Sequence, residues 1–446
     1  MSGDPVQPRR LSRRGLVLLP VALGGCSMFD SWFSDTKEKL PGKRVAVLTP
    51  RRGLTVDGNA GAVVLPEPVA NADWPQAGGN PSHAMGHLQA GTPLSTAWRT
   101  DIGEGGGYRR KITGQPVVAG GRVFTMDSDA VVTAYDAAGG GRIWRLDTQA
   151  EDDRSSNVGG GIAVEGDTLY AGTGRAEVLA LEAATGSIRW RKPVGTPVRA
   201  APTIAEGRIF VLTLDNQMQA LAVDDGHRLW SYQATPPDTS VLGLPAPAYS
   251  AGLVVAGFGS GDLVALRAAT GSVVWSDSLA AAGGRTSLLE LSAVRGMPVV
   301  ADGRVYAGSL GRQTVAMDVR TGRRLWEREI ATGDTPWLAG DWLFLLATDG
   351  QVAALSRIDG RIAWVTQLPQ YEDEEKKKDP IHWIGPVLAG NRLILGSNTG
   401  VAMFVNPTTG EIIGQQSLSG ALSVAPSVAG GTVFVITDDA TMVALR

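Results

Sequence analysis

The sequence predicts an all-β fold, an eight-bladed β-propeller of four-stranded antiparallel blades. Three observations lead to this prediction: a phrase ending in tryptophan recurs along the chain, a proline precedes it at a constant distance, and short β-rich runs alternate with glycine turns. The chain has 446 residues, including 58 glycines and 12 tryptophans. Since a single hydrophobic core rarely grows beyond ~250–300 residues, a chain of this length has to be subdivided, and a repeat does this.

Seven near-copies of one phrase define the repeat. The phrase has a T-G, D-G or G-G turn before a short strand-like run, and six copies end in a tryptophan. The copies are DAAGGGRIW (Trp144), EAATGSIRW (Trp190), AVDDGHRLW (Trp230), RAATGSVVW (Trp275), DVRTGRRLW (Trp326), SRIDGRIAW (Trp364) and NPTTGEIIG, in which Gly414 replaces the tryptophan. A large aromatic residue at one register of every unit favours packing between adjacent units over a ligand-binding role.

A position 28 residues before each phrase end marks the start of each unit. Six of these seven positions are proline: they are Pro116, Ile162, Pro202, Pro247, Pro298, Pro336 and Pro386. An eighth unit starts at Pro426 and reaches the end of the sequence, Arg446, before its tryptophan. The intervals between units vary from 38 to 51 residues, so insertions are confined to the connections between units.

Within each unit the sequence predicts four short strands, as the first unit illustrates. Residues 116–119, 122–126 and 131–135 predict three strands, and a fourth begins at residue 142. Runs of β-branched residues bounded by glycine and aspartate turns are typical of antiparallel strands, and proline is tolerated at a strand's first position. Four strands per unit at this period indicate propeller blades.

The two ends of the repeat region predict how the ring closes. The eighth unit lacks a fourth strand, whereas residues 94–99, with Trp98, form a strand-like run before the first unit. We therefore expect the N-terminal strand to complete the last blade, which removes the edges that an open ring would expose.

The N-terminus predicts an export signal and a lipid anchor. Four arginines in residues 9–14 precede a short apolar run, residues 16–23, that is too short to cross a hydrocarbon core of ~30 Å. The sequence LGGC ending at Cys26 resembles the bacterial lipobox, which implies lipidation of Cys26; the alternative is a buried cysteine after an ordinary signal. We expect a signal peptide at 1–25, a lipidated flexible tether at 26–72 and the propeller at 73–446, with export through either the Sec or the twin-arginine route.

Composition excludes several classes of function. Cys26 is the sole cysteine, so the chain forms no intrachain disulfide, thiolate zinc cluster or CxxCH haem site. A net charge of −3 argues against nucleic-acid binding, which depends on neutralising phosphates. We assign no metal to His83 and His87, because Pro81 and Gly86 argue against a helix there.

The repeated phrase, best seen at residues 183–190, resembles the pyrroloquinoline-quinone propeller repeat, over residues 74–446. Two branches of that superfamily are compared here, the quinoprotein dehydrogenases and the BamB lipoproteins of the outer-membrane β-barrel assembly machinery. The lipobox, the eight units and the lack of a disulfide favour the BamB family. That resemblance implies a non-catalytic scaffold without a cofactor, lipid-anchored on the periplasmic face of the outer membrane. It implies BamA, other machinery subunits and unfolded outer-membrane proteins as partners.

Two inter-blade connections are the predicted partner surface. The segment 285–298 resembles a BamB loop, although Ala293, Arg295 and Glu290 change its charges, and the connection 239–247 corresponds to the loop through which BamB engages BamA. The candidate contact residues are Val241, Leu242, Gly243, Leu244, Leu288, Leu289, Glu290, Leu291 and Arg295. Exposed apolar clusters in surface connections often mark interfaces, and the alternative is that these leucines fold inward over the blades.

Two other functions remain open on the sequence. One is a quinone-dependent periplasmic dehydrogenase, which would need a calcium site of six to eight oxygen ligands that the sequence does not reveal. The other is an envelope-binding or sensor propeller outside the assembly machinery. Both share the propeller, because a fold by itself does not decide function.

Overall fold

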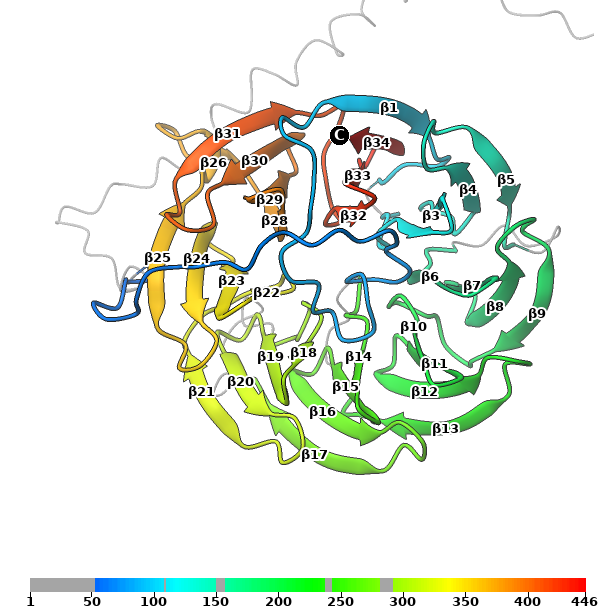
Figure 1. Ribbon diagram of the computed structural model, residues 1–446. Helices are drawn as coiled ribbons and strands as arrows, with labels where there is room; N and C mark the ends of the chain where they lie inside the picture. The colour runs from blue at the N-terminus through cyan, green and yellow to red at the C-terminus, as the bar shows by residue number, and fades with distance from the viewer. Residues whose placement is uncertain (1–52, 108–109, 150–156, 237–242, 281–291) are drawn as a thin grey trace, which may run out of the picture. The chain divides into compact units, whose positions relative to one another are not determined.

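The computed structural model describes residues 53–107, 110–149, 157–236, 243–280 and 292–446. Residues 53–446 form one compact unit, and its strands form eight four-stranded antiparallel sheets around a common axis, an eight-bladed β-propeller (Figure 1). The all-β prediction is therefore confirmed. Among the described residues no helix is long and apolar enough to span a membrane.

The first four blades follow the order of the sequence, with the innermost strand of each blade first. Blade 1 is β2 (Val117–Ala119), β3 (Arg122–Met126), β4 (Val132–Asp136) and β5 (Arg142–Leu146). Blade 2 is β6 (Gly161–Glu165), β7 (Thr168–Gly172), β8 (Glu177–Glu182) and β9 (Ile188–Pro193). Blade 3 is β10 (Thr203–Ala205), β11 (Arg208–Leu212), β12 (Gln217–Ala222) and β13 (Arg228–Gln233). Blade 4 is β14 (Ala248–Ser250), β15 (Leu253–Gly257), β16 (Asp262–Arg267) and β17 (Val273–Ser278).

The next three blades repeat this pattern, with one inserted hairpin. Blade 5 is β18 (Val299–Ala301), β19 (Arg304–Gly308), β20 (Thr314–Asp318) and β21 (Arg324–Arg328). Blade 6 is β22 (Trp337–Ala339), β23 (Trp342–Leu346), β24 (Gln351–Ser356) and β25 (Ile362–Gln367). Blade 7 is β28 (Trp383–Ala389), β29 (Arg392–Ser397), β30 (Val401–Val405) and β31 (Ile412–Ser417). The hairpin of β26 (Tyr371–Asp373) and β27 (Lys378–Pro380) lies between blades 6 and 7.

The eighth blade is assembled from both ends of the unit, as the sequence predicts. It consists of β32 (Ser427–Ala429), β33 (Thr432–Ile436), β34 (Thr441–Leu445) and, outermost, β1 (Thr96–Asp101). Backbone hydrogen bonds between Ser95 and Arg446 join the two ends, at 2.6 and 2.8 Å. Only the strand bounds differ from expectation, because β1 covers 96–101 instead of 94–99.

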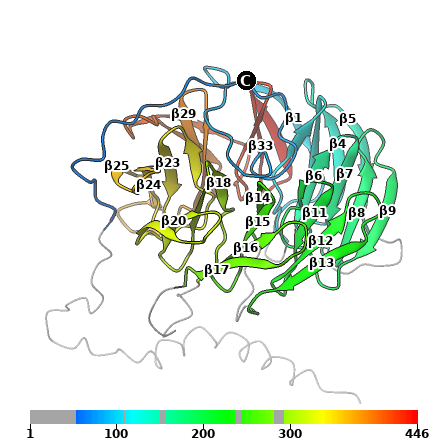
Figure 2. The ribbon, with the colours of Figure 1, turned by 60° about the horizontal axis from the view of Figure 1, so that its bottom comes forward.

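The compact unit begins at Gly53 and not at residue 73, so part of the predicted tether is folded. Figures 1 and 2 show this N-terminal segment crossing one face of the ring from the rim near β25 to the centre. At the rim, Asp57 pairs with Arg328 at 2.8 Å, and Val63 is buried in the core shared by blades 6–8. The sequence does not reveal this docking because an extended segment bonded to many different strands has no periodic pattern of its own.

At the centre, residues 71–88 bond to the innermost strands of all eight blades; we call them the hub segment. Trp74 pairs with Val118 of β2 in both directions, at 2.7 and 2.8 Å. The other contacts are Asn71 with Val428 and Gly430, Pro75 with Val164, Gln76 with Ile204, Pro81 with Tyr249, Ser82 with Val300, Gly86 with Trp337 and Leu88 with Leu388. An inner strand has a neighbouring strand on one side only. The hub segment therefore supplies hydrogen-bond partners that the free edge of an inner strand would otherwise lack.

Candidate partner-binding surface

The connections between blades carry the predicted contact residues, so we describe that region as the candidate site. Each connection between blades leads into the first residue of an inner strand. Besides the inner strands themselves, the hub segment bonds to the turns that follow them, such as those at Gly390 and Gly430. Of the predicted residues, the structure describes Gly243, Leu244 and Arg295. The other candidates, Val241, Leu242, Leu288, Leu289, Glu290 and Leu291, lie outside the described residues, as does Cys26.

The described end of the first connection is anchored to blade 3. The Leu244 backbone N–H donates to the Arg199 oxygen at 2.8 Å, and Gly243 has a φ of +81°. The Leu244 side chain is partly buried and packs against a cluster of blades 3 and 4 that contains Phe210 and Phe258. Leu244 therefore presents only part of its surface to a partner.

The second connection packs beside the first, on the end of strand β15. Val294 is fully buried, and its backbone N–H donates to the Phe258 oxygen at 3.1 Å. Gly257 provides the space for this arrangement, because a Cβ there would collide with Val294 and come within 3.5 Å of Pro245. Two connections that are far apart in the sequence thus become neighbours through one residue without a side chain.

Gly243, Leu244 and Arg295 line one cavity on the axis of the ring. The cavity has a volume of about 160 Å³ and reaches the hub segment, where Trp74 and Trp337 stack with their ring centroids 6.3 Å apart. A second, larger cavity of about 680 Å³ shares Arg295 and Asp334 with the first. Arg295 therefore lies where the axial cavity meets this larger cavity, whereas Gly243 and Leu244 line the axial cavity alone.

Charges of both signs surround this junction. Arg295 is exposed and acts electrostatically on Asp334, whose carboxylate accepts a hydrogen bond from the Gly385 N–H at 3.3 Å. Burial raises the pKa of Asp334 to about 6, although Arg295 and this hydrogen bond both lower it. Lys111, which is partly buried, adds a cation to the lining of the larger cavity. The surface can therefore engage a partner through polar as well as apolar groups.

Lys111 and Asp334 are residues of this surface that no sequence pattern indicates. Each lies in a connection with no distinctive motif, so only the closure of the ring brings them to the junction. Among the described residues no group of three histidine, cysteine or acidic side chains is placed to hold a metal ion. His83, in the hub segment, donates through Nδ1 to the Pro298 oxygen at 2.7 Å, and burial lowers its pKa to about 4.

The fold and the site together define an eight-bladed β-propeller with a candidate protein-binding surface on its inter-blade connections. The family model described as outer membrane protein assembly factor BamB matches residues 128–366 and 371–446. The chain belongs to this family.

Relatives and solved structures agree with this assignment. Outer membrane protein assembly factor BamB of Yersinia pestis is 29% identical over 359 residues, covering 76% of this chain and 88% of the relative. BamB of Escherichia coli K12 is 28% identical over 356 residues, covering 78% and 88%. The BamB crystal structure from Moraxella catarrhalis superposes with a TM-score of 0.66 at 23% identity, covering 79% of this chain and 99% of that one.

A dehydrogenase shares the fold as well. Quinohemoprotein alcohol dehydrogenase from Comamonas testosteroni has a TM-score of 0.62 at 15% identity, covering 84% of this chain and 80% of the enzyme. At that identity the likeness extends to the fold alone, since propellers carry enzymes and scaffolds alike.

Proposed function

We propose that this chain is a non-catalytic scaffold lipoprotein of the outer-membrane β-barrel assembly machinery, which binds BamA and assists the insertion of β-barrel proteins. The observation that carries this proposal is the family match, which spans most of the propeller. The lipobox at Cys26 supports attachment to the periplasmic face of the outer membrane. No step of this function requires a cofactor or a reaction at the axis.

The connections at Gly243–Leu244 and Arg295 are the proposed docking surface for the periplasmic domains of BamA. Three features support it: the residues converge on one cavity, Leu244 is partly exposed, and Arg295 is an exposed cation. Rigid anchoring by Arg199 and by the close packing at Gly257 favours affinity, because a connection that is already ordered loses less entropy on binding.

Co-purification from membranes tests the proposal. The tagged, lipidated chain should recover BamA from detergent-solubilised membranes, and Leu242→Asp with Leu244→Asp should abolish this recovery. The matched control is Leu229→Asp, because Leu229 is an equally sized, 41% exposed residue on the rim of blade 3. Undiminished recovery with the double variant, at an unchanged melting temperature, would reject the docking surface.

A second experiment tests the anchor independently of BamA. Replacing Cys26 by Ser removes the thiol that would carry the lipid, so the exported chain should move from the membrane to the soluble periplasmic fraction. Fractionation of cells that express either form measures this. Retention of the serine variant in the membrane fraction would contradict lipid anchoring at Cys26.

A further inference from the structure

The outer edge of blade 6 is occupied by a segment of the same chain. The Asp57 N–H donates to the Ile362 oxygen at 2.8 Å, and the Asp57 carboxylate accepts the Ile362 N–H at 2.8 Å. Residues 53–57 thus use both backbone groups that Ile362 presents on the free edge of β25. A free strand edge is a ready template for an added extended chain.

Further contacts hold this segment in a groove between blades 5 and 6. Arg328 of β21 pairs with the Asp57 carboxylate, and the Gln351 side chain accepts the Leu54 N–H at 2.7 Å. Leu54 packs against the hydrophobic cluster shared by the two blades. The groove therefore accommodates an extended peptide that has an apolar residue three positions before an aspartate.

Three other blades present an apolar residue at the same edge position without an occupant. Ile188 of β9, Val273 of β17 and Ile412 of β31 pair with their third strands in the same register as Ile362, each beside the same bulge. The exposed fractions are 44% for Ile188 and 50% for Val273, against 5% for Ile362. Within the described ranges, no segment outside the sheet bonds to the backbone of Ile188, Val273 or Ile412.

At the edges of blades 2 and 4 an uncharged side chain stands where Arg328 stands in blade 5, whereas the acceptor equivalent to Gln351 is a carboxylate, Glu177 in blade 2 and Asp262 in blade 4. The residue equivalent to Arg328, two positions after the tryptophan of the preceding blade, is Leu146 beside Ile188 and Tyr232 beside Val273.

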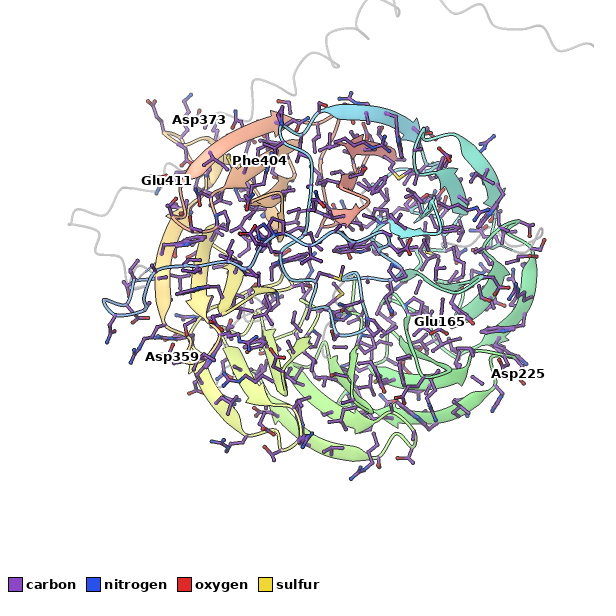
Figure 3. All side chains as sticks on the ribbon, viewed as in Figure 1. Glu165, Asp225, Asp359, Asp373, Phe404 and Glu411 are labelled. Atoms are coloured by element: carbon purple, nitrogen blue, oxygen red, sulfur yellow. The ribbon has the colours of Figure 1, made fainter. Side chains whose placement is uncertain are left out.

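The corresponding groove between blades 2 and 3 instead has Lys192 and Arg228. The groove beside Ile412 has Thr366 at the position of Arg328, and the Thr366 hydroxyl donates to the Gly410 oxygen. Figure 3 shows Asp225, Asp359 and Glu411 projecting from the rim, at the turns that precede the fourth strands of blades 3, 6 and 7.

We propose that the outer edges of blades 2 and 4, at Ile188 and Val273, bind extended, unfolded polypeptide segments as the edge of blade 6 binds residues 53–57. The occupant is a segment of another polypeptide with a large apolar residue and, a few positions later, an aspartate or asparagine. The backbone N–H of this aspartate or asparagine donates to the oxygen of the edge residue, and its side-chain oxygen accepts a hydrogen bond from the N–H of the edge residue. The inference deepens the proposed function, on which it rests for the source of unfolded chains.

A peptide with the sequence of residues 53–61, GLTVDGNAG, is the probe, labelled with fluorescein and titrated with the full mature chain by anisotropy. We expect the wild type to bind it and the double variant Ile188→Lys, Val273→Lys to bind at least tenfold more weakly, with an unchanged melting temperature. A probe with alanine in place of its aspartate should bind more weakly as well. Absence of wild-type binding, or equal binding by the double variant, would overturn the proposal.

Two controls keep the result specific. Leu229→Lys changes an exposed leucine of blade 3 that lies outside these grooves, so it should leave the affinity unchanged; a tenfold loss there would indicate general apolar binding and reject the proposal. Asp57→Ala vacates the groove of blade 6 and should raise the number of peptides bound per chain. Sedimentation of the chain without peptide tests whether a second copy of the chain occupies these edges. If the wild type self-associates and the double variant does not, the occupant is a second copy, and the proposal is rejected.

The test is separable from the role at BamA. The double variant leaves Leu244 and Arg295 intact, so it should still recover BamA from membranes at the wild-type level. If the double variant loses peptide binding but recovers BamA fully, both proposals are supported. If Leu242→Asp with Leu244→Asp loses BamA recovery but keeps peptide binding, the result bears on the docking surface alone.

Discussion

The indole Nε1–H of Trp144 in blade 1 donates a hydrogen bond to the backbone oxygen of Ala183 in blade 2, at 3.0 Å. The same bond recurs around the ring, from Trp98 to Ala137, Trp190 to Val223, Trp230 to Ala268, Trp275 to Val319, Trp326 to Arg357 and Trp364 to Pro407. The repeated tryptophan therefore joins each blade to the next, except blade 7 to blade 8, as its constant register predicts.

The glycine of the repeated phrase belongs to the same contact. A Cβ on Gly186 would lie 2.6 Å from the Trp144 ring, and Gly186 has a φ of +77°. This geometry also explains why Gly414 replaces the eighth tryptophan. Blade 8 has chain ends, Arg446 and Ser95, where the other blades have the turn that receives the ring.

We expect Trp144→Ala to destabilise the propeller by about 3–5 kcal/mol, because the substitution removes a large ring and an inter-blade hydrogen bond. Urea denaturation followed by tryptophan fluorescence and circular dichroism measures the change. The control is the adjacent Ile143→Ala, since Ile143 is 46% exposed and should cost less than about 1 kcal/mol. Equal effects from the two substitutions would contradict the joining role of the tryptophan.

Gly186→Ala should be more damaging than Gly166→Ala, although both glycines have positive φ. A Cβ at Gly166 meets no atom within 4 Å, so that substitution costs only backbone strain, about 1 kcal/mol. At Gly186 the Cβ also displaces the Trp144 ring. Melting temperatures of the two variants provide the comparison, and similar values would show that the ring shifts without cost.

The hub segment should be essential to the ring even when the closing strand is retained. A chain that starts at residue 53 should fold like the full chain, whereas a chain that starts at residue 92 keeps β1 but leaves seven inner strand edges, and the Trp337 indole of blade 6, without their partners in the hub segment. We expect the shorter chain to be insoluble or to melt at a much lower temperature. Soluble yield and thermal unfolding test this, and a stable monomer starting at residue 92 would refute it.

Stability should fall on acidification because of His83. Its pKa is about 4 in the folded chain and 6.5 in the unfolded chain, so the unfolded state takes up the proton first as the pH falls below 6.5. At pH 5 this linkage costs about 2 kcal/mol. His83→Asn, which suits the φ of 60° at this position, should remove this part of the pH dependence. Parallel pH profiles of the two chains' unfolding free energies would contradict this assignment.

The sequence determined the eight units, the four strands in each and the closure of the ring, because these features repeat. A period as constant as the interval from Pro116 to Trp144 reports the same local structure each time, and the strand bounds observed in blade 1 differ from those expected by one residue at most. The lipobox at Cys26 is equally local, and the structure does not describe it.

Only the tertiary structure decided what the non-repeating segments do. The hub segment bonds eight strands that span most of the chain, and Leu244, Arg295 and Asp334 come together through three separate connections. Such contacts leave no period in the sequence, since each residue meets a different partner. The physical reason is that closing a ring creates one axis and eight inner edges at once, and residues far apart in the chain must satisfy them together.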